Sequence, residues 1–301
     1  VYMSYFPLFF DLVFDCTKLI KCFRLCCQKT GRFIFLCLLL YLEKTLYKYG
    51  YIFMVMQTIE LRRSIRKYTS EPVSQELLDN LLQMAERTQT MGNLQLYSVV
   101  VTREAEMKAK LAPCHFNQPM VTEAPVVLTF CADYHRTTRW CEERQADAGY
   151  DNMLSFMNAA TDALLYCQTF CNLAEEKGLG LCFLGTTIYQ PRQIIRILNL
   201  PRLVVPVATI TLGWPAEEPA LTDRLPLASI VHKESYADYT REDIDKYYAE
   251  KEALPENRHF VELNKKDTLA QIFTDIRYTR KDNEAMSEEL VATLKQQGFL
   301  H

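Results

Sequence analysis

The sequence is poor in glycine and in the motifs that glycine makes possible. Only 9 of its 301 residues are glycine, and none forms G-x-G-x-x-G or G-x-x-x-x-G-K-[ST]. The backbone loops that usually cradle dinucleotides and nucleoside triphosphates are therefore missing. G-x-S-x-G and H-E-x-x-H are missing as well, which removes the usual signatures of serine hydrolases and zinc proteases. We expect any bound phosphate to be held by side chains.

From Cys114 onward, the cysteines and histidines also lack the spacing that is typical of a metal site. The 5 histidines are scattered singly, and the cysteines from Cys114 onward contain no C-x-x-C pair. Neither a zinc ribbon nor a thioredoxin-like site is indicated. We predict no metal site, and we interpret these cysteines as buried free thiols of a reducing cytoplasm.

The chain has no strong charge of one sign. Its formal net charge is -3 at pH 7, with 49% hydrophobic and 24% charged residues, which is typical of a globular protein. Its pI of about 6.0 gives no electrostatic reason to expect a nucleic-acid partner. A nucleic-acid module that uses one basic cluster is a disfavoured alternative, which salt-dependent retention on DNA would support.

Residues 1–55 differ in composition from residues 56–301. They carry seven basic and three acidic residues, a net +4, which leaves 27 basic and 34 acidic residues, a net -7, for the rest. They also hold five of the 11 cysteines. We expect this extension to lie outside the functional domain, with Met56 as a plausible true start. A membrane anchor and a separate domain with its own role are the alternatives.

No hydrophobic run is long enough to span a bilayer. The longest uncharged apolar run, residues 33–42 (FIFLCLLLYL), has ten residues, whereas a spanning helix needs roughly 20. A signal peptide is not indicated either, because the apolar YFPLFF precedes the basic residues and no A-x-A-like site follows. We therefore expect no membrane partner and a cytoplasmic location.

The order of elements expected in residues 56–240 is α, β, α, β, long α, β, α, β. Helical spacing predicts an amphipathic helix from an N-cap at Ser74 to Ala85. Pro206 requires the last strand to lie at an edge or to contain a bulge. The long helix is apolar on nearly every side, which predicts that it is buried in the core or in a subunit interface. The expected strands are 95–102, 124–132, 181–184 and 203–212, and the expected helices are 104–111, 151–174 and 191–198.

The C-terminal part is expected to be an irregular segment followed by polar helices. After Trp214-Pro215 the chain has no periodic pattern until about Tyr239. Two polar helices are expected beyond it, at 240–254 and 268–297. We regard residues 240–301 as a helical extension of the same domain.

The densest cationic cluster is the run R-R-S-I-R-K-Y at residues 62–68. Two arginines and a hydroxyl within a turn and a half can converge on one phosphate through charge-assisted hydrogen bonds. A solvated basic helix end is the alternative for this cluster. Phe183, Leu184 and Gly185, at the end of an expected strand, offer backbone that a planar ring can approach closely.

Four motifs in this order resemble the flavin-dependent nitroreductase family. They are R-R-S-I-R-K-Y, T-Q-T-M-G-N-L-Q, G-L-G-L-C-F-L-G-T, and L-G-W-P followed by R-L-P. The sequence is most similar to the oxygen-insensitive, NADPH-preferring branch of nitroreductases and flavin reductases. The resemblance covers the chain from about Met56 to the C-terminus and is tighter up to Tyr236.

The resemblance implies an α+β fold with a mostly antiparallel sheet surrounded by helices. It also implies a homodimer with one FMN in each of two interface clefts. By the same resemblance, the flavin-binding residues are expected to be the phosphate and ribityl contacts Arg62, Arg63, Ser64 and Arg224, the loop residues Thr88, Thr90 and Gln95, the pyrimidine contacts Arg66 and Gln118, and the ring contacts Phe183, Leu184 and Gly185.

The chain departs from the family pattern at three positions. Relatives often have His at the position of Arg62, a second Gly at that of Thr186, and Lys at that of Thr222. The last departure removes one cation from the expected phosphate site, so it puts FMN affinity in more doubt than FMN identity.

We predict an FMN-dependent oxidoreductase that takes hydride from NADPH or NADH and passes it to nitroaromatics, quinones or free flavin. No acid-base pair is needed, since N5 of the flavin accepts the hydride and the protein positions the ring. Arg66 is expected to stabilise negative charge at the flavin pyrimidine. A non-catalytic flavin-binding or sensory protein on the same scaffold is the alternative.

Overall fold

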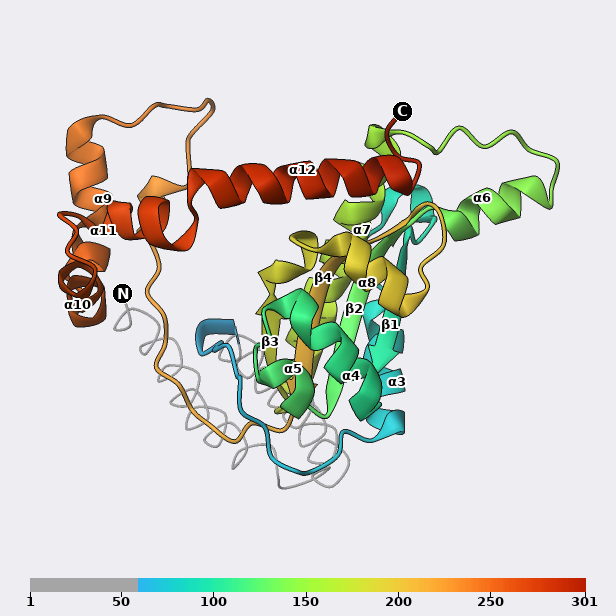
Figure 1. Cartoon of the computed structure of the whole chain (residues 1–301), viewed down its shortest axis with the longest axis horizontal. Coiled ribbons are helices and arrows are strands. Elements are labelled where there is room, and N and C mark those ends of the chain that lie inside the picture. The colour runs from blue at the N-terminus through green and yellow to red at the C-terminus, as the bar shows by residue number, and fades with distance from the viewer. Residues whose placement is uncertain (1–58) are drawn as a thin grey trace, which may run out of the picture. The chain divides into compact units, whose positions relative to one another are not determined.

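The computed structural model describes residues 59–301, which fold around a four-stranded antiparallel sheet (Figure 1). Its strands lie in the order β1 (Tyr97–Thr102), β2 (Val126–Asp133), β4 (Val204–Gly213) and β3 (Gly180–Leu184). All three neighbouring pairs are antiparallel, as predicted. Leu61–His301 form one compact unit. The predictions for residues 1–55 lie outside the described residues.

Pro206 lies at a bulge in β4. Strand β4 pairs with β3 only over Thr209–Gly213, so at Pro206 it is paired on the β2 side alone. The pairing of β4 with β2 shifts between Phe130 and Cys131, which face Ala208 and Pro206. Val207 is the extra residue, and the bulge removes the need for a ladder hydrogen bond from the proline. Both predicted conditions are met, since Pro206 lies at a bulge and beyond the end of the pairing with β3.

The helices α7 (Met153–Glu176) and α3 (Gln75–Ala85) cover one face of the sheet. The Asn152 side chain caps α7 by accepting from the Ser155 N–H, and Ser74 caps α3 as predicted by accepting from the Leu77 N–H. Phe170 of α7 is fully buried against Phe130 of β2. This layer forms the main hydrophobic core.

The helices α4 (Ala105–Leu111), α5 (Met120–Glu123) and α8 (Pro191–Leu198) lie on the opposite side of the sheet from α7 (Figure 1). A second, smaller hydrophobic cluster joins these helices to β3 through Leu111, Val121, Ile194 and Leu184. Because this cluster packs beneath the end of β3, it fixes the segment that follows the strand. A further helix, α6 (His135–Glu142), follows β2 and was not predicted.

The C-terminal extension is built from four α-helices and a π-helical turn, in place of the two helices predicted. They are α9 (Arg241–Ala253), α10 (Pro255–Leu263), α11 (Leu269–Ile272), the π-helix Phe273–Arg277 and α12 (Arg280–Gln296). The prediction of one helix over 268–297 is therefore wrong. The helix widens into the π-helical turn and ends at Tyr278. The backbone of Thr279 is extended, and its side chain caps α12 by accepting from the Asp282 N–H.

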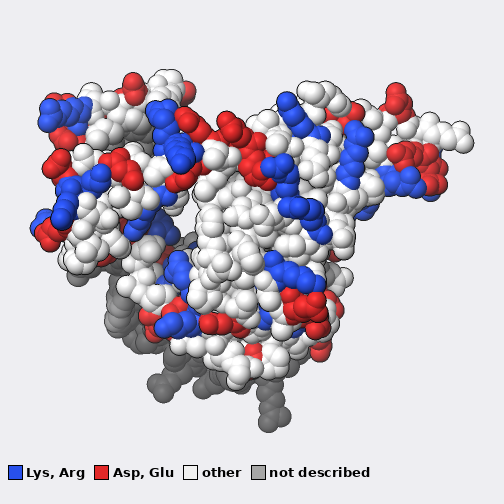
Figure 2. Space-filling model, viewed as in Figure 1, with Lys and Arg blue, Asp and Glu red and all other residues white. Residues whose placement is uncertain are grey.

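The described surface carries charges of both signs. Figure 2 shows Lys and Arg interspersed with Asp and Glu over the face in view, with no continuous basic stripe on it. Within residues 59–301, no helix combines the length and the apolar character that crossing a membrane requires. No group of His, Cys, Asp and Glu side chains in the same residues is arranged to hold a metal ion.

Candidate functional site

A cavity of about 370 Å³ lies between the end of β3 and the C-terminal extension. It brings together five of the residues predicted from the sequence to bind flavin: Arg66, Gln118, Phe183, Leu184 and Gly185. These residues come from three separate parts of the chain. The cavity therefore assembles the predicted pyrimidine contacts and the predicted ring contacts in one place.

The wall formed by Phe183, Leu184 and Gly185 is open to a flat ligand. The strand β3 lies at the edge of the sheet, and Phe183 keeps 50% of its surface exposed although its strand neighbours are buried. A Cβ atom built on Gly185 would meet nothing within 4 Å. Backbone without a side chain beside an exposed aromatic ring is what close approach of a planar ring system requires.

Arg66 is held by its backbone, which leaves its side chain available at the cavity. Oε1 of Glu217 accepts from the N–H of Arg66 at 2.7 Å and from the N–H of Lys67 at 3.1 Å. The guanidinium forms no ion pair with a carboxylate of residues 59–301; Nη1 donates to the Ser64 carbonyl at 3.5 Å, and the side chain also contacts the Cys182 thiol. Burial raises the pKa of the neighbouring Cys182 thiol, and the positive charge of Arg66 opposes that rise.

Gln118 and Thr186 reach the cavity from positions fixed by His115. Gln118 Nε2 donates to the His115 carbonyl at 3.1 Å, and His115 Nδ1 lies 2.8 Å from Thr186 Oγ1. His115 is fully buried, and this burial lowers its pKa from 6.5 to about 4, so the ring is neutral at pH 7. Its Nε2 has no partner in the described chain. Thr186 stands where relatives often have a second glycine.

The predicted phosphate-binding segment lies beside the beginning of β3. The N–H of Ile65 donates to the Leu181 carbonyl at 2.9 Å, which fixes the segment on the strand. Arg62 turns toward α7, where Nη2 donates to Glu175 at 2.6 Å and to Asn172 at 2.5 Å. These contacts give Arg62 a role in fastening the segment to α7. Its predicted role at the phosphate stays a prediction.

Arg63 keeps a donor without a partner in the described residues, whereas Ser64 is exposed and its predicted phosphate contact stays a prediction. Arg63 Nη1 pairs with Glu218 at 3.2 Å, but 79% of the Glu218 side chain is exposed. The Nε of Arg63 is buried with no partner in residues 59–301. Since buried donors are nearly always hydrogen-bonded, this orphaned N–H indicates a missing acceptor. A phosphate oxygen is an acceptor of the required charge.

Thr88, Thr90 and Gln95 lie apart from the cavity, at the loop between α3 and β1. The loop is fixed by the buried carboxylate of Asp162 on α7, which accepts from the N–H groups of Met91 and Leu96 at 2.9 and 3.1 Å. The Thr88 hydroxyl is buried without a partner in the described residues. Within one chain, these three residues are therefore separate from the cavity that contains the predicted ring and pyrimidine contacts.

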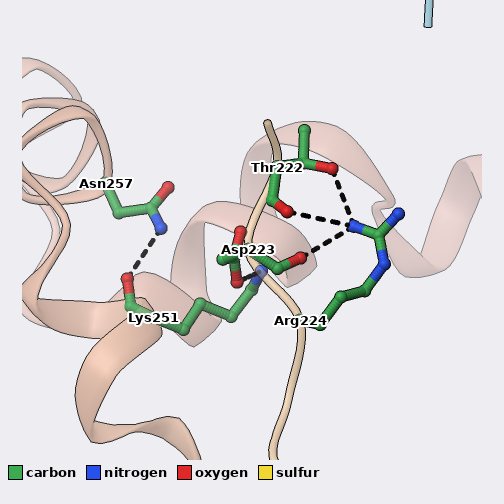
Figure 3. Close-up of polar contacts among 5 residues, drawn as sticks. All are labelled: Thr222, Asp223, Arg224, Lys251 and Asn257. Atoms are coloured by element: carbon green, nitrogen blue, oxygen red, sulfur yellow. Dashed lines mark hydrogen bonds and ion pairs between the residues drawn. The ribbon is translucent and has the colours of Figure 1, made fainter. Parts of the chain in front are cut away.

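Arg224 lies in the irregular segment between β4 and α9. Its Nη1 donates to Oγ1 of Thr222 at 2.7 Å and to the Asp223 carbonyl at 2.8 Å (Figure 3). Asp223 pairs in turn with Lys251 of α9 at 2.8 Å. Thr222, which stands where relatives often have Lys, thus anchors Arg224. Arg224 does not line the cavity, and its predicted phosphate contact stays a prediction.

The C-terminal extension supplies a wall of the cavity that the sequence analysis missed. This wall consists of Arg277, Tyr278, Asp282, Asn283 and Met286. The sequence presents these residues as part of one polar helix, and nothing in their spacing brings them to β3. The signal that was available is the aromatic and basic character of F-T-D-I-R-Y within an otherwise polar stretch.

The six cysteines of residues 59–301 are free and buried, as predicted. Cys167 and Cys171, four residues apart on α7, contact each other in the core. Burial and the contact between the two thiols raise the pKa of Cys167. Neither thiol lines the cavity, so both belong to core packing.

Comparisons with known proteins define the class of this fold and site. The nitroreductase family profile matches residues 59–214. FMN reductase [NAD(P)H] of Bacillus subtilis (strain 168) is 33% identical over 187 residues, which cover 60% of this chain and 74% of the relative. Oxygen-insensitive NADPH nitroreductase of Salmonella typhimurium is 31% identical over 182 residues, again covering 60% and 74%. The chain belongs to the nitroreductase family.

A solved structure extends the similarity through the C-terminal helices. A candidate oxidoreductase from Bacteroides fragilis NCTC 9343 is 59% identical, with a TM-score of 0.80 over 81% of this chain and 100% of that chain. The family and the fold predicted from the sequence are both confirmed. Nothing in the similarities favours the alternative of a non-catalytic flavin-binding protein.

Proposed function

We propose that this protein is an FMN-dependent NAD(P)H oxidoreductase that acts in the cytoplasm as a homodimer and reduces nitroaromatics, quinones or free flavin. The observation that carries the proposal is the cavity. Its lining contains the five residues that the family resemblance predicted as ring and pyrimidine contacts. The relatives named as FMN reductase and NADPH nitroreductase support the same cofactor and the same hydride donor.

The residues present fit FMN. The open backbone at Gly185 suits a flat ring, and the orphaned Nε of Arg63 suits a phosphate. When bound, FMN supplies the hydride chemistry that no side chain of the cavity provides. Nothing comparable is available in the cavity for an adenosine half, so FMN is favoured over FAD.

The protein residues bind, orient and stabilise charge. Arg66 lines the cavity without a carboxylate partner in residues 59–301, and it would stabilise negative charge at the pyrimidine edge of FMN bound there. Gln118 offers an amide to the same edge. Phe183 and Gly185 would support the ring of bound FMN and keep water from one of its faces.

An exposed apolar stripe on α7 supports the homodimer. Leu154, Met157, Leu164 and Leu165 leave 70%, 49%, 43% and 44% of their surfaces exposed. They recur at helical spacing along the side of α7 that does not face the sheet. In the proposed dimer, a partner that covers this stripe would bring its own loop 88–95 toward the cavity. This arrangement would explain why Thr88, Thr90 and Gln95 lie apart from the cavity residues within one chain.

The test separates the two half-reactions. Under anaerobic conditions, NADPH or NADH should bleach the flavin absorbance of the purified protein, and an added quinone should restore it. Continuous oxidation of the nicotinamide should then require the quinone. A flavin that binds but is neither reduced by nicotinamide nor reoxidised by acceptors would support the sensory alternative.

Residues 56–301 form the working unit in this proposal. All of the cavity residues and the whole family match lie after Met56. A truncated protein that begins at Met56 should therefore bind FMN and turn over as the full chain does. Loss of both on truncation would give residues 1–55 a functional role.

A further inference from the structure

We infer that Arg277 is a specificity-determining residue that selects aromatic electron acceptors carrying a negatively charged substituent. The inference rests on the proposed function and adds the substrate class of the same cavity. It comes from the wall that the C-terminal extension contributes, to which no sequence motif pointed. Arg277 and Tyr278 line this wall opposite the predicted ring contacts of β3.

Arg277 is positioned by an unusual backbone and by two aromatic rings. It is the last residue of the π-helix Phe273–Arg277, which the Tyr278 N–H closes by donating to the Phe273 carbonyl at 2.8 Å. Its guanidinium lies 4.9 Å from the centre of the Phe260 ring and 5.5 Å from that of Phe273. Cation–π contacts hold a guanidinium without neutralising its charge. π-Helical turns are frequent at functional sites.

The positive charge of Arg277 has no carboxylate partner within residues 59–301. The carboxylate that shares the cavity wall, Asp282, forms no ion pair with Arg277; its Oδ2 accepts from the Thr279 hydroxyl at 2.7 Å, at the beginning of α12. By contrast, Arg280, three residues further on, pairs with Glu284 at 3.6 Å and is 89% exposed. An arginine that remains unpaired in a cavity is available to an anionic ligand.

The remaining lining defines the rest of the ligand. Phe116, Phe183 and Tyr278 expose 51%, 50% and 53% of their surfaces, and all three line the cavity with Tyr189 and Met286. Such a lining favours a flat aromatic ring. Arg66 is assigned to the flavin pyrimidine, so Arg277 is the cation left for a second ligand. The cavity is small enough that Arg277 would meet a substituent on the reacting ring itself.

The experiment compares two acceptors that differ in charge alone. 4-Nitrobenzoate and 4-nitrobenzamide present the same nitro group on the same ring, with a carboxylate or a neutral amide opposite. KM and kcat are measured for both with wild type, Arg277→Gln, Arg277→Lys and the control Arg280→Gln. Benzoate and benzamide, which carry no reducible nitro group, are titrated calorimetrically into the oxidised holoenzymes as a readout independent of turnover.

Arg277→Gln should raise KM for 4-nitrobenzoate roughly tenfold, the effect of one lost charge-assisted hydrogen bond. It should leave KM for 4-nitrobenzamide and kcat within about twofold, and weaken benzoate binding in parallel. Arg277→Lys should recover part of the loss, since the charge is restored. Arg280→Gln should match wild type, and added salt should raise KM for the anionic acceptor more than for the neutral one.

Two results would overturn the inference while leaving the proposed function intact. Equal losses for both acceptors in Arg277→Gln would assign the residue a structural role. A rise in KM for NADPH with both acceptors unchanged would assign it to the phosphates of the donor. A wild-type protein that reduces neither acceptor and holds no flavin would instead remove the proposed function, and the inference with it.

Discussion

At the scale of single residues, Gly185 offers a sharp test of where the ring of the cofactor lies. Replacing Gly185 with Val should leave folding intact, because its Cβ meets nothing within 4 Å and its φ is not positive. The added methyl groups would occupy the cavity, so FMN affinity should fall at least tenfold. Titration of FMN into the apoprotein measures this fall. Gly149→Val is the matched control, since that position is equally open and lies outside the cavity.

Arg63 tests the phosphate end of the site. Arg63→Gln removes the charge and the orphaned Nε donor, and it should weaken FMN by about 1.5–3 kcal/mol, or roughly ten- to hundredfold. Arg241→Gln, at a position 90% exposed on α9, should change nothing. Both apoproteins are titrated with FMN and, separately, with riboflavin. Because riboflavin has no phosphate, an equal loss for the two ligands would contradict the assignment.

His115 links pH to the stability of the cavity wall. Its folded pKa of about 4 lies below the 6.5 of an exposed histidine, so the unfolded chain binds the proton more readily. The stability contributed by the neutral ring is therefore complete above pH 6.5 and is lost as the pH falls toward 4. The loss should be on the order of 3 kcal/mol.

Urea unfolding between pH 7 and 4 measures this contribution. His115→Gln should show a flatter decline of the unfolding free energy with falling pH, whereas His259→Gln, at an exposed position, should follow the wild type. If His115→Gln declines as steeply as wild type, the burial of a neutral ring is not the source of the pH dependence.

The residues foreseen from the sequence are those whose role is local. Phe183, Leu184 and Gly185 are consecutive, and their place at a strand end could be read from the chain alone. Thr186 and His115 could not be paired in this way, because they meet only through the packing of two 3-10 turns, Ala112–His115 and Gly185–Ile188.

At the level of the helices and strands, α7 has two different sides. One side packs on the sheet through Phe156, Tyr166 and Phe170, and the stripe around Met157 is exposed, which is where the proposed homodimer would have its second subunit. Met157→Asp would bury an unpaired charge in that interface, so the dimer and the flavin should be lost together.

Sedimentation analysis with flavin absorbance as the signal tests this coupling. Gln75→Asp, at the exposed first position of α3, is the control and should remain a dimer that carries flavin. A Met157→Asp monomer that retains its flavin would mean that the site is complete within one chain.

Elements with a strong apolar period were predicted well, and of the polar helices only 240–254 was confirmed, as α9, whereas α6, α10 and the break within 268–297 were missed. The predicted limits 191–198 match α8, and the predicted strands differ from β1 to β4 by one or two residues. The break at Tyr278 was missed because no proline or glycine marks it. It results from the π-turn and from the Thr279 cap, and it places Arg277 in the cavity.

At the scale of the whole molecule, the sheet brings distant segments to one site. Its strands lie in the order β1-β2-β4-β3. At the end of β4, the Trp214 carbonyl accepts from the Thr69 N–H at 2.9 Å, which joins this strand to the residues that precede α3. The family resemblance predicted this architecture, whereas composition and periodicity gave only the order of elements. The irregular segment from Trp214 to Tyr239 connects β4 to the C-terminal helices, and the π-helical turn and α12 form one wall of the cavity.

The identity of the bound cofactor tests the central claim most directly. Protein purified without added flavin, or reconstituted with an equimolar mixture of FMN and FAD, is denatured by heat, and the released flavin is separated by chromatography. We expect FMN, at close to one per chain, because the site offers donors for one phosphate and backbone at Gly185 that one flavin ring can approach. Release of FAD, or of no flavin after reconstitution, would contradict it.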